Sequence, residues 1–480
     1  MTTLSFFDAA ATDADRLALV SAEGSITYGE LGTRVELARK WLAAQGIAPG
    51  RPEPVALVMH NSVEAIELFW AAFALGRPLL VLHPRQRSEV RAALVARTGA
   101  VEIDAASFGA RTPSRSGPLL APEPSPATRL IVPTSGTQGH PKLVMLSERA
   151  LVASASASWQ NLGVVDDERW LACLPLAHVG GLSILTRCLL ARRTVVLFDG
   201  ESGLLARIEA LGRALEEQRV TLVSLVPTVL DALLAHGFRP PETLRAVLLG
   251  GAAASPSLLE RARLAGLPLL TSYGMTEAAS QVTTRSYAER HDPFELHGGL
   301  GGSGRPLPGI RLRIGKDDEI QLAGPMLFDG YWGEPPARAD SGWFRTGDRG
   351  VIRENGELVV LGRCDDLIVT GGENVDPVAV ESMLSRLPGL RGACVFGVDD
   401  PRWGQIVAAA LAFAPGHEPS SSEIAVFCNE TLPSHERPRL VALFPDLPLN
   451  PTGKVDRRQL KEIATPLLVR LGDPVFTPPR

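Results

Sequence analysis

Short apolar, β-branched runs alternate with stretches of helical periodicity along most of the chain, and this alternation limits the possible folds more than any other feature. The runs 55–59 and 78–82 are too short for buried helices, and they flank a helical stretch from Ser62 to about Leu75. Such alternation is typical of α/β layers around largely parallel sheets. Further predicted strands lie at 129–133, 169–175, 194–198, 220–226, 244–249 and 267–272.

The first predicted helix has a clear start. Thr27 and Glu30 have the spacing of a capping box, in which the threonine hydroxyl and the glutamate carboxylate each accept a backbone N–H at the beginning of a helix. Apolar residues then recur at helical spacing up to Gly46. They are Leu31, Val35, Ala38 and Leu42.

The chain of 480 residues is too long for one ordinary hydrophobic core. After about Gly298 it becomes rich in Gly, Pro and short strands, which predicts a small antiparallel β subdomain. From Asp366 it returns to mixed helices and strands. We therefore predict an α/β fold with a large N-terminal domain, residues 1–364, made of two layered α/β lobes and this β subdomain. A small, mobile α+β domain, residues 365–480, is expected to follow.

Composition narrows the class of partner. The chain has 48 basic and 53 acidic residues with no concentrated basic tract, so we expect no nucleic-acid partner. No apolar run reaches the roughly 18 residues that span a bilayer, so no membrane insertion is expected. The five cysteines are scattered without zinc-site spacing, which favours reduced thiols and a cytoplasmic location. A metal ion is therefore expected to arrive with a substrate, and homo-oligomer formation is left open.

The segment Thr134–Lys142 has the composition of a polyphosphate-binding loop. It follows an apolar run and combines hydroxyl residues, two glycines and one lysine. Glycines let backbone N–H groups approach phosphate closely, and lysine supplies positive charge. The segment does not match the G-x-x-x-x-G-K-[ST] pattern. A polar surface turn is the alternative.

Two more segments place polar groups after apolar runs. Ser272–Glu277 brings an aromatic ring, a hydroxyl and a carboxylate to a strand end, where ligands collect in open α/β sheets. The ring suits stacking on a nucleobase, and the carboxylate suits Mg²⁺ that bridges to phosphate. Trp343–Asp348 adds a carboxylate on a predicted turn, suited to ribose hydroxyls or to capping a strand.

Two further clusters lie near the C-terminal domain. Gly362–Asn374 spans the predicted join between the domains, and Leu449–Arg457 carries Lys454 on a Pro/Gly loop. A lysine on such a loop is ordinarily a solvated charge. Taken together, the five segments in this order resemble the superfamily of acyl- and aryl-CoA synthetases, luciferases and peptide-synthetase adenylation domains. The resemblance extends over nearly the whole chain.

The resemblance implies an enzyme, an AMP-forming acid–thiol ligase that uses ATP, Mg²⁺ and coenzyme A. Lys454 is then expected to bridge the carboxylate and phosphate, Thr276 to contact the α-phosphate, and Glu277 to bind Mg²⁺. A hinge matching Asp365 would let Gly371, Gly372, Glu373 and Asn374 replace the lysine in the CoA step. The expected ATP-binding residues are Thr134, Ser135, Gly136, Thr137, Gly139, Lys142, Gly250, Gly251, Ala252, Tyr273, Gly274, Asp348 and Arg363.

Within this superfamily, the segments 174–190, 272–284, 366–381 and 403–405 are most similar to the o-succinylbenzoate:CoA ligases of menaquinone synthesis. The similarity implies that His178 lies beside the acyl carboxylate as a positioning group, and that Arg187 faces a second carboxylate. The alternatives are a core histidine and an arginine that stabilises the helix C-terminus or extends its charged end to water. The expected substrate-binding residues are His178, Ser183, Arg187, Ser280 and Gln281.

Several alternatives stay open from the sequence. Gln138 and Leu143 depart from the hydroxyl residue and the glycine usual in the phosphate loop, which would suit a degenerate nucleotide-binding protein. Another aryl- or acyl-CoA ligase would have the same motifs. A stand-alone adenylation enzyme that loads a carrier protein would have them too.

Overall fold

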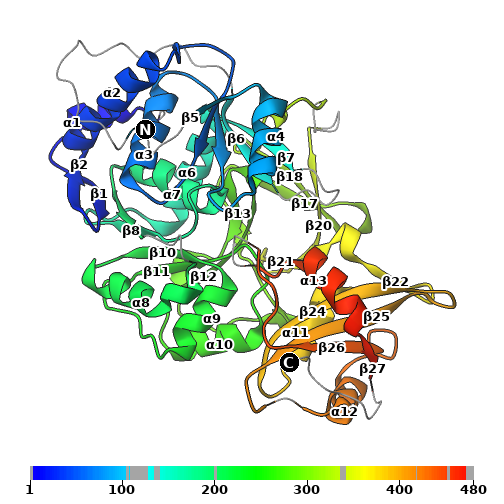
Figure 1. Cartoon of the computed structure of the whole chain (residues 1–480). Coiled ribbons are helices and arrows are strands. Elements are labelled where there is room, and N and C mark those ends of the chain that lie inside the picture. Colours follow the sequence, from blue (N-terminus) through cyan, green and yellow to red (C-terminus); the bar gives the residue numbers. More distant parts are fainter. Residues whose placement is uncertain are drawn as a thin grey trace.

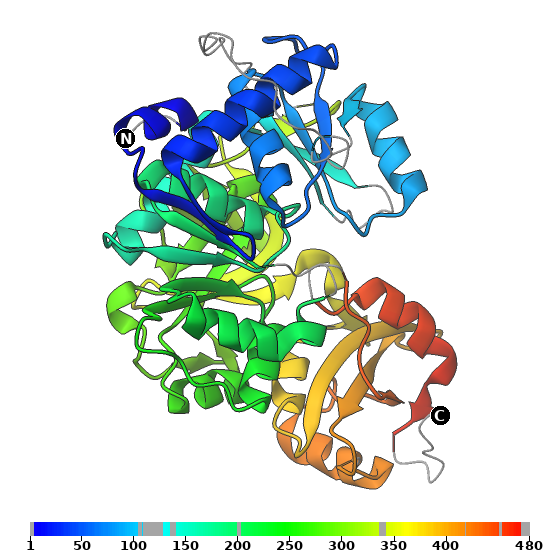
Figure 2. The same ribbon diagram turned by 60° about the vertical axis from the view of Figure 1, so that its left-hand side comes forward.

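A computed structural model describes residues 4–103, 108, 128–134, 141–198, 203–335, 342–417, 419–450 and 454–471. Figure 1 shows two N-terminal α/β lobes, drawn in blue to green, and a C-terminal part in orange and red that lies beside them. In the view of Figure 2 the three parts separate clearly, with the C-terminal part below the first lobe and next to the second.

The larger sheet has nine strands in the order β16-β13-β12-β11-β10-β8-β9-β1-β2. Its central strands are parallel, and the antiparallel pairs β1–β2, β12–β13 and β13–β16 lie at its two ends. The bounds are β1 Leu17–Ser21, β2 Gly24–Thr27, β8 Arg169–Ala172, β9 Thr194–Leu197, β10 Leu222–Leu225, β11 Ala246–Leu249, β12 Leu269–Met275, β13 Ser280–Thr284 and β16 Arg305–Pro306.

The second sheet has six strands in the order β19-β7-β6-β4-β3-β5, of which β3–β6 run parallel. β7 and β19 close it with antiparallel pairs. The bounds are β3 Val55–Val58, β4 Leu79–Leu82, β5 Val101–Ile103, β6 Thr128–Thr134, β7 Lys142–Ser147 and β19 Gly330–Tyr331.

Alternating residues of these strands pack on opposite faces of each sheet, as a pleated strand requires. On β8, Trp170 packs in the core that is shared with the lobe of the six-stranded sheet. Leu171 packs on the other face, in the core that also contains Leu211, Leu230 and Leu259. The helix bounds are α1 Phe6–Thr12, α2 Tyr28–Ala44, α3 Val63–Ala74, α4 Ser88–Thr98, α6 Glu148–Leu162, α7 Val179–Ala191, α8 Ile208–Glu217, α9 Pro227–Ala235 and α10 Pro256–Leu264.

The predicted start of α2 is confirmed. The Thr27 side chain accepts from the N–H of Glu30, and the Glu30 carboxylate accepts from the N–H of Thr27 at 2.8 Å. Leu31, Val35 and Leu42 are buried as the spacing predicted. The strand predicted at 169–175 is shorter, because β8 ends at Ala172 and a loop follows.

The antiparallel β subdomain predicted after Gly298 is also confirmed. Its four strands have the order β17-β18-β20-β21, and β14 and β15 form a separate hairpin. The bounds are β14 Leu296–His297, β15 Leu300–Gly301, β17 Arg311–Ile314, β18 Glu319–Ala323, β20 Phe344–Ile352 and β21 Leu358–Arg363.

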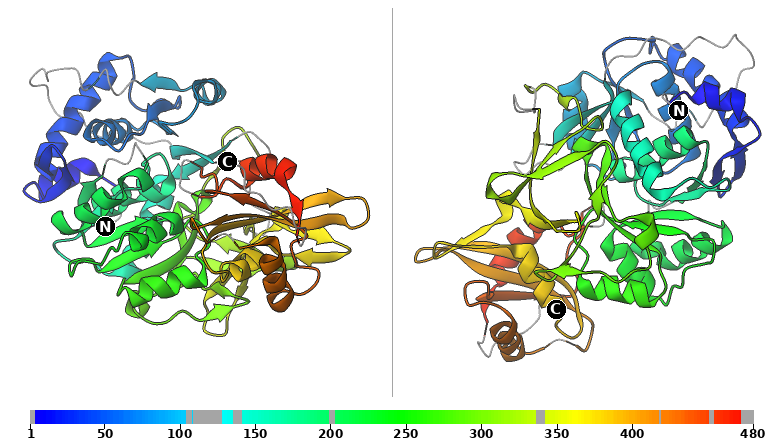
Figure 3. Two further views of the ribbon diagram at one scale, coloured as in Figure 1. Left: turned by 60° about the horizontal axis from the view of Figure 1, so that its bottom comes forward. Right: turned by 180° about the vertical axis from the view of Figure 1, so that it is seen from behind.

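The C-terminal part is α+β. Its sheet has the order β23-β22-β25-β26-β27 with β24 paired to β25, and helices cover both faces. Both views of Figure 3 show the β24–β25 ribbon projecting away from the N-terminal lobes. The bounds are β22 Ile368–Thr370, β23 Glu373–Val375, α11 Pro377–Leu384, β24 Leu390–Asp400, β25 Gly404–Phe413, α12 Ser421–Thr431, β26 Leu440–Phe444, α13 Arg457–Ala464 and β27 Val469–Arg470.

Candidate active site

Several of the predicted site residues lie where the carboxyl ends of the parallel strands meet the C-terminal part. Gly250 and Gly251 follow β11, Tyr273 lies in the last part of β12, and His178 lies between β8 and α7. The loop before α13 brings Lys454 to the same place, because a Cβ placed on Gly251 would lie 2.9 Å from the Lys454 Cε. The topology thus gathers segments distant in sequence at one edge, as in other open α/β sheets.

Tyr273, Asp348 and Arg363 form one hydrogen-bonded group. The Tyr273 hydroxyl donates to Asp348 Oδ2 at 2.6 Å, and Arg363 Nη1 donates to Asp348 Oδ1 at 3.1 Å. Burial and the Asp348 carboxylate raise the pKa of Tyr273 well above its usual value, so the hydroxyl stays a donor. The prediction that Asp348 lies on a turn was wrong, since it lies within β20 and pairs with Arg363 on β21.

Neighbouring side chains approach the backbone of Gly250 and Gly251 so closely that a Cβ would not fit at either residue. A Cβ on Gly250 would lie 2.6 Å from the Ser272 hydroxyl, and Gly251 has a φ of +85° beside Lys454. Burial lowers the pKa of Lys454, and the charge of Asp348 partly opposes this. Ala252 follows in the same exposed turn. A partly buried cation therefore lies between the N-terminal lobes and the C-terminal part.

The phosphate segment is described only at its two ends. Thr134 ends β6 and pairs with Lys142, the first residue of β7, and the Lys142 Nζ lies 4.8 Å from the centroid of the Tyr331 ring. Ser135, Gly136, Thr137, Gln138 and Gly139 lie outside the described residues. Leu143 is fully buried, so the departure from glycine there serves packing.

Thr276 and Glu277 begin a short 3₁₀ turn directly after β12. The Glu277 Oε1 accepts a hydrogen bond from the Tyr331 hydroxyl at 2.9 Å. Burial and the Glu277 charge raise the pKa of Tyr331. Among the described residues no cation pairs with Glu277, and no group of three or more His, Cys, Asp or Glu side chains could form a metal cluster by itself. Glu277 is thus a half-buried carboxylate that can accept a cation.

His178 is the N-cap residue of α7, and its ring centroid lies 5.0 Å from that of His83, which follows β4. Burial lowers the pKa of His178 to about 4, and the nearby His83 and Lys454 add to this effect. The imidazole is therefore neutral near pH 7. Its Nε2 is buried without a hydrogen-bond partner among the described residues, as is the Nε2 of His83.

Arg187 is buried in the middle of the protein, with 2% of its surface exposed. Its Nη2 donates to the Ser280 hydroxyl at 3.1 Å, and its guanidinium carbon lies 5.2 Å from the Trp170 ring centroid. Burial lowers the pKa of Arg187 to about 10, and no described carboxylate compensates. The helix predicted at 180–190 is confirmed as α7, but the alternative that Arg187 extends to water was wrong, because this helix is buried on all sides from Gly181 onward.

Ser280 has a strained backbone at this position. Its φ is +114°, and the preceding Ala279 has a φ of +51°. The Ser183 hydroxyl lies 3.3 Å from the Ser280 hydroxyl, and the backbone there packs so tightly that a Cβ on Gly274 would lie 2.0 Å from the Ser280 carbonyl oxygen. Such strain is typical of functional sites. Gln281 is buried and donates to the Thr284 hydroxyl at 2.7 Å, leaving its Oε1 without a partner.

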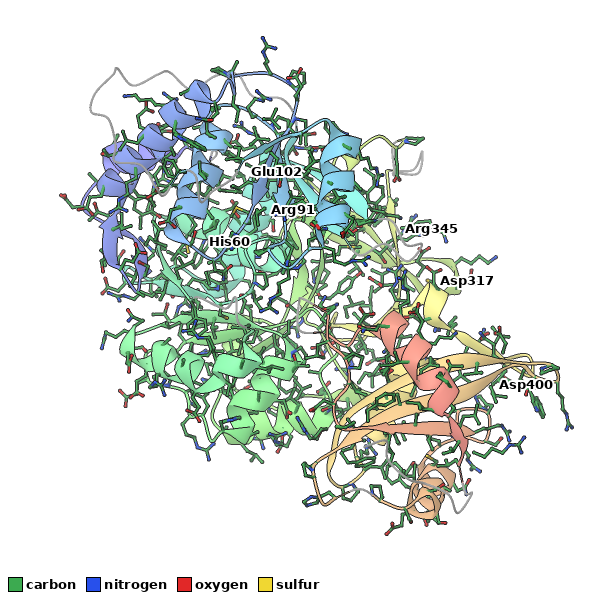
Figure 4. The ribbon with its side chains drawn as sticks, viewed as in Figure 1. His60, Arg91, Glu102, Asp317, Arg345 and Asp400 are labelled. Carbon is green, nitrogen blue, oxygen red and sulfur yellow. The ribbon has the colours of Figure 1, made fainter. Side chains whose placement is uncertain are left out.

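The residues expected to act in the CoA step lie elsewhere. Gly371 and Gly372 form the turn between β22 and β23, with Glu373 and Asn374 exposed on β23. Thr370 pairs with Gly404 beside the β24–β25 turn, which Figure 4 marks with Asp400 at the end furthest from the N-terminal lobes. Lys454 and this hairpin therefore lie at different places on the C-terminal part. Asp365 lies between the parts, in a 3₁₀ turn, with its carboxylate 3.7 Å from Arg363 Nη2.

Sequence reasoning missed Tyr331, His83 and Trp170. Each belongs to a strand or strand end without a recognisable local motif. Only His83, a histidine directly after an apolar run, had a signal that could have been used.

Comparison with known proteins agrees with this geometry. The family model for AMP-binding enzymes matches residues 6–103 and 101–332, and the model for the AMP-binding enzyme C-terminal domain matches residues 379–454. Together with the two-lobed α/β fold and the C-terminal lysine loop, these matches define the class: the chain belongs to the AMP-binding enzyme family.

Individual relatives give more specific information than the family models do. The 2-succinylbenzoate–CoA ligase of Bacillus subtilis is 31% identical over 93% of this chain and 95% of its own, and that of Bacillus licheniformis is 34% identical over 93% and 96%. A solved structure of o-succinylbenzoate CoA synthetase from Bacillus subtilis, in complex with its acyl-adenylate intermediate, covers 96% of this chain and 98% of its own, with a TM-score of 0.85 and 30% identity.

No helix among the described residues is long and apolar enough to cross a membrane.

Proposed function

We propose that this chain is an ATP-dependent acid:CoA ligase of menaquinone biosynthesis that adenylates 2-succinylbenzoate and then transfers the acyl group to coenzyme A. Relatives with this name align over nearly the full chain, and one Bacillus subtilis relative binds ATP and a magnesium ion. The five cysteines are free thiols, which suits the cytoplasmic location that we infer.

One observation supports 2-succinylbenzoate as the substrate. Arg187 is a buried cation held only by a serine hydroxyl and an aromatic face, with no described carboxylate in contact. An uncompensated buried charge is costly, so the surroundings of Arg187 favour a ligand that brings an anion. 2-Succinylbenzoate has two carboxylates, and the one that is not activated can pair with Arg187. A monocarboxylic aryl acid leaves the cation unpaired.

Replacement of Arg187 tests this substrate. A guanidinium–carboxylate contact away from water contributes about 1.5 to 3 kcal/mol, so Arg187→Met should lower kcat/KM for 2-succinylbenzoate about ten- to a hundredfold. Methionine keeps much of the side-chain volume in the packed helix. Adenylation is measured by ATP–pyrophosphate exchange, with benzoate as the reference acid. Equal losses on both acids, or a wild-type preference for benzoate, would favour a general aryl-CoA ligase.

Adenylation is an in-line attack of a carboxylate oxygen on the α-phosphorus of ATP, so the protein must bring two anions together and stabilise the leaving pyrophosphate. We assign Lys454 to the carboxylate and α-phosphate, because it is a partly buried cation of the C-terminal part that lies beside Gly251 of the N-terminal lobes. Neutral His178 positions the acyl carboxylate and cannot act as a strong base at a pKa of about 4. Tyr273 stacks on adenine, Asp348 accepts hydrogen bonds from the ribose hydroxyls, and Arg363 holds the Asp348 carboxylate in place. We assign the remaining nucleotide contacts to the other ATP-binding residues that the sequence analysis predicted.

We assign Glu277 as the protein ligand of Mg²⁺, since its carboxylate has a tyrosine donor but no cation among the described residues. Bound Mg²⁺ neutralises phosphate charge. Glu277→Gln should therefore raise the Mg²⁺ and ATP concentrations needed for half-maximal adenylation by about tenfold with an unchanged melting temperature. Tyr331→Phe, which removes only the hydrogen bond to Glu277, should have a smaller effect. Unfolding of the glutamine variant would instead mark Glu277 as structural.

We further propose that residues 365–480 rotate about Asp365 between the two half-reactions. Lys454 faces the N-terminal lobes in the present arrangement, which suits adenylation, while the Gly371–Asn374 hairpin projects away from them. Bringing the hairpin to the acyl-adenylate requires a rigid-body movement about few residues. The polar contacts that now join the two parts are few enough to exchange, for example Arg349 with Asp376 at 3.4 Å.

A further inference from the structure

Asn61 connects the two N-terminal lobes next to the candidate active site. It follows β3 of the six-stranded sheet, directly after His60, which Figure 4 labels at the level where the two lobes meet. Its side chain leaves its own lobe and bonds to backbone groups of the nine-stranded sheet. Nδ2 donates to the carbonyls of Ala172 at 3.2 Å, Leu174 at 3.1 Å and Phe198 at 3.3 Å, and Oδ1 accepts from the N–H of Leu176 at 3.0 Å.

These contacts fix the loop that follows β8. Parallel strands β8 and β9 end at Ala172 and Leu197, and their last ladder hydrogen bond runs from the Phe198 N–H to the Ala172 carbonyl at 3.3 Å. The Asn61 carboxamide bonds to four backbone groups at this end of the sheet, three carbonyls and one N–H. An Asn side chain can do this, because its carbonyl oxygen accepts while its two N–H groups donate, one of them shared between two carbonyls. The loop conformation therefore depends on a residue of the other lobe.

The same loop ends at His178. The His178 N–H donates to the Pro175 carbonyl at 3.1 Å, and α7 begins at the next residue without a side-chain cap. The helix start packs directly on the loop, since a Cβ on Gly181 would lie 2.4 Å from the Pro175 carbonyl oxygen. A shift of the loop would consequently move the His178 ring.

The partner of that ring belongs to the lobe of Asn61. His83 follows β4, the parallel neighbour of β3, and its ring lies 5.0 Å from that of His178. The His83 Nδ1 accepts from the Arg85 N–H at 3.0 Å, which fixes the orientation of the ring. His178 is thus held against one lobe by two neighbouring strand ends, through a ring contact and through the loop that Asn61 binds.

We propose that Asn61 is a positioning residue for His178, setting the place of the imidazole beside the acyl carboxylate during adenylation. This proposal rests on the function proposed above. Asn61 lies across the lobe boundary from the loop, so it acts on the substrate only through the backbone it binds.

A double-mutant cycle tests the proposal. In the full chain, Asn61→Ala should lower kcat/KM for 2-succinylbenzoate in ATP–pyrophosphate exchange about ten- to a hundredfold, because displacements of about 1 Å have effects of this size. The KM for the acid should rise more than the KM for ATP. In a His178→Ala background the same change should cost less than about twofold, since coupled residues are not additive.

The controls separate the possible failures. Asn161→Ala removes another amide-to-carbonyl hydrogen bond, to Arg285 at 3.1 Å, and should leave the exchange rate unchanged. If Asn61→Ala does not fold, Asn61→Ser, which keeps one hydroxyl donor, enters the same cycle. Equal losses in both backgrounds would overturn the positioning role. Absence of exchange in the wild type with 2-succinylbenzoate would instead overturn the proposed function.

Discussion

Lys454→Ala should lower the rate of acyl-adenylate formation by about a hundred- to a thousandfold, because removal of one preorganised charge at a reacting centre has effects of this size. Lys454 is the partly buried cation beside Gly251, and loss of contact with water lowers its pKa, so its charge is poorly screened. Thioester formation from supplied acyl-adenylate should change little, because the lysine loop is expected to have left the site in that step.

The two half-reactions are measured separately, by pyrophosphate exchange and by CoA consumption from synthetic acyl-adenylate. Lys461→Ala is the matched control, since this lysine is exposed on α13 of the same C-terminal part. It should leave both rates unchanged. Equal loss of both half-reactions in Lys454→Ala would contradict separate arrangements for the two steps.

Local patterns predicted most of the elements, because the signals lie within single elements. The capping box at Thr27 and the apolar spacing after it define α2 without tertiary information. The apolar runs of the parallel strands are equally local, since these strands are buried on both faces. Polar residues at strand ends then indicate the edge where ligands collect, which is why Tyr273 could be predicted for the site, whereas Gly251 was predicted only through the family resemblance.

Tertiary packing determines the features that local sequence patterns did not predict. Arg187 stands in a helix with polar residues at regular intervals, yet the helix has no solvent face beyond Gly181, because sheets and helices of both lobes surround it. Asp348 lies in residues of turn composition, but β20 continues through them with Gly347 at a φ of +72° and a register shift at Arg349. Ser280 combines a φ of +114° with close packing of its carbonyl against Gly274, and no local pattern predicts either feature.

The function of the Gly371–Asn374 hairpin is best tested at Gly372. Its φ is +88° and a Cβ there meets no atom within 4 Å, whereas a Cβ on Gly371 would lie 2.8 Å from the Trp403 ring. A larger side chain at Gly372 therefore spares the packing of the C-terminal part, and its obstruction is felt only where another molecule approaches the turn. Gly372→Leu should slow thioester formation from supplied acyl-adenylate about a hundredfold, since the thiol is kept from the acyl carbon. Adenylation should stay within about twofold of the wild type, because the hairpin projects away from the lobes in that step.

Backbone strain at Gly372 needs its own control, because a side chain at positive φ is unfavourable wherever it stands. Gly416→Leu supplies it: Gly416 lies in the same C-terminal part with a φ of +78°, and a Cβ there also meets no atom within 4 Å. The two variants should lose similar amounts of stability in thermal unfolding, yet only Gly372→Leu should lose the CoA step. A comparable loss of thioester formation in Gly416→Leu would attribute the effect to strain in the C-terminal part. A loss of adenylation in Gly372→Leu equal to its loss of thioester formation would place the hairpin in both steps and remove the need for a rotation about Asp365.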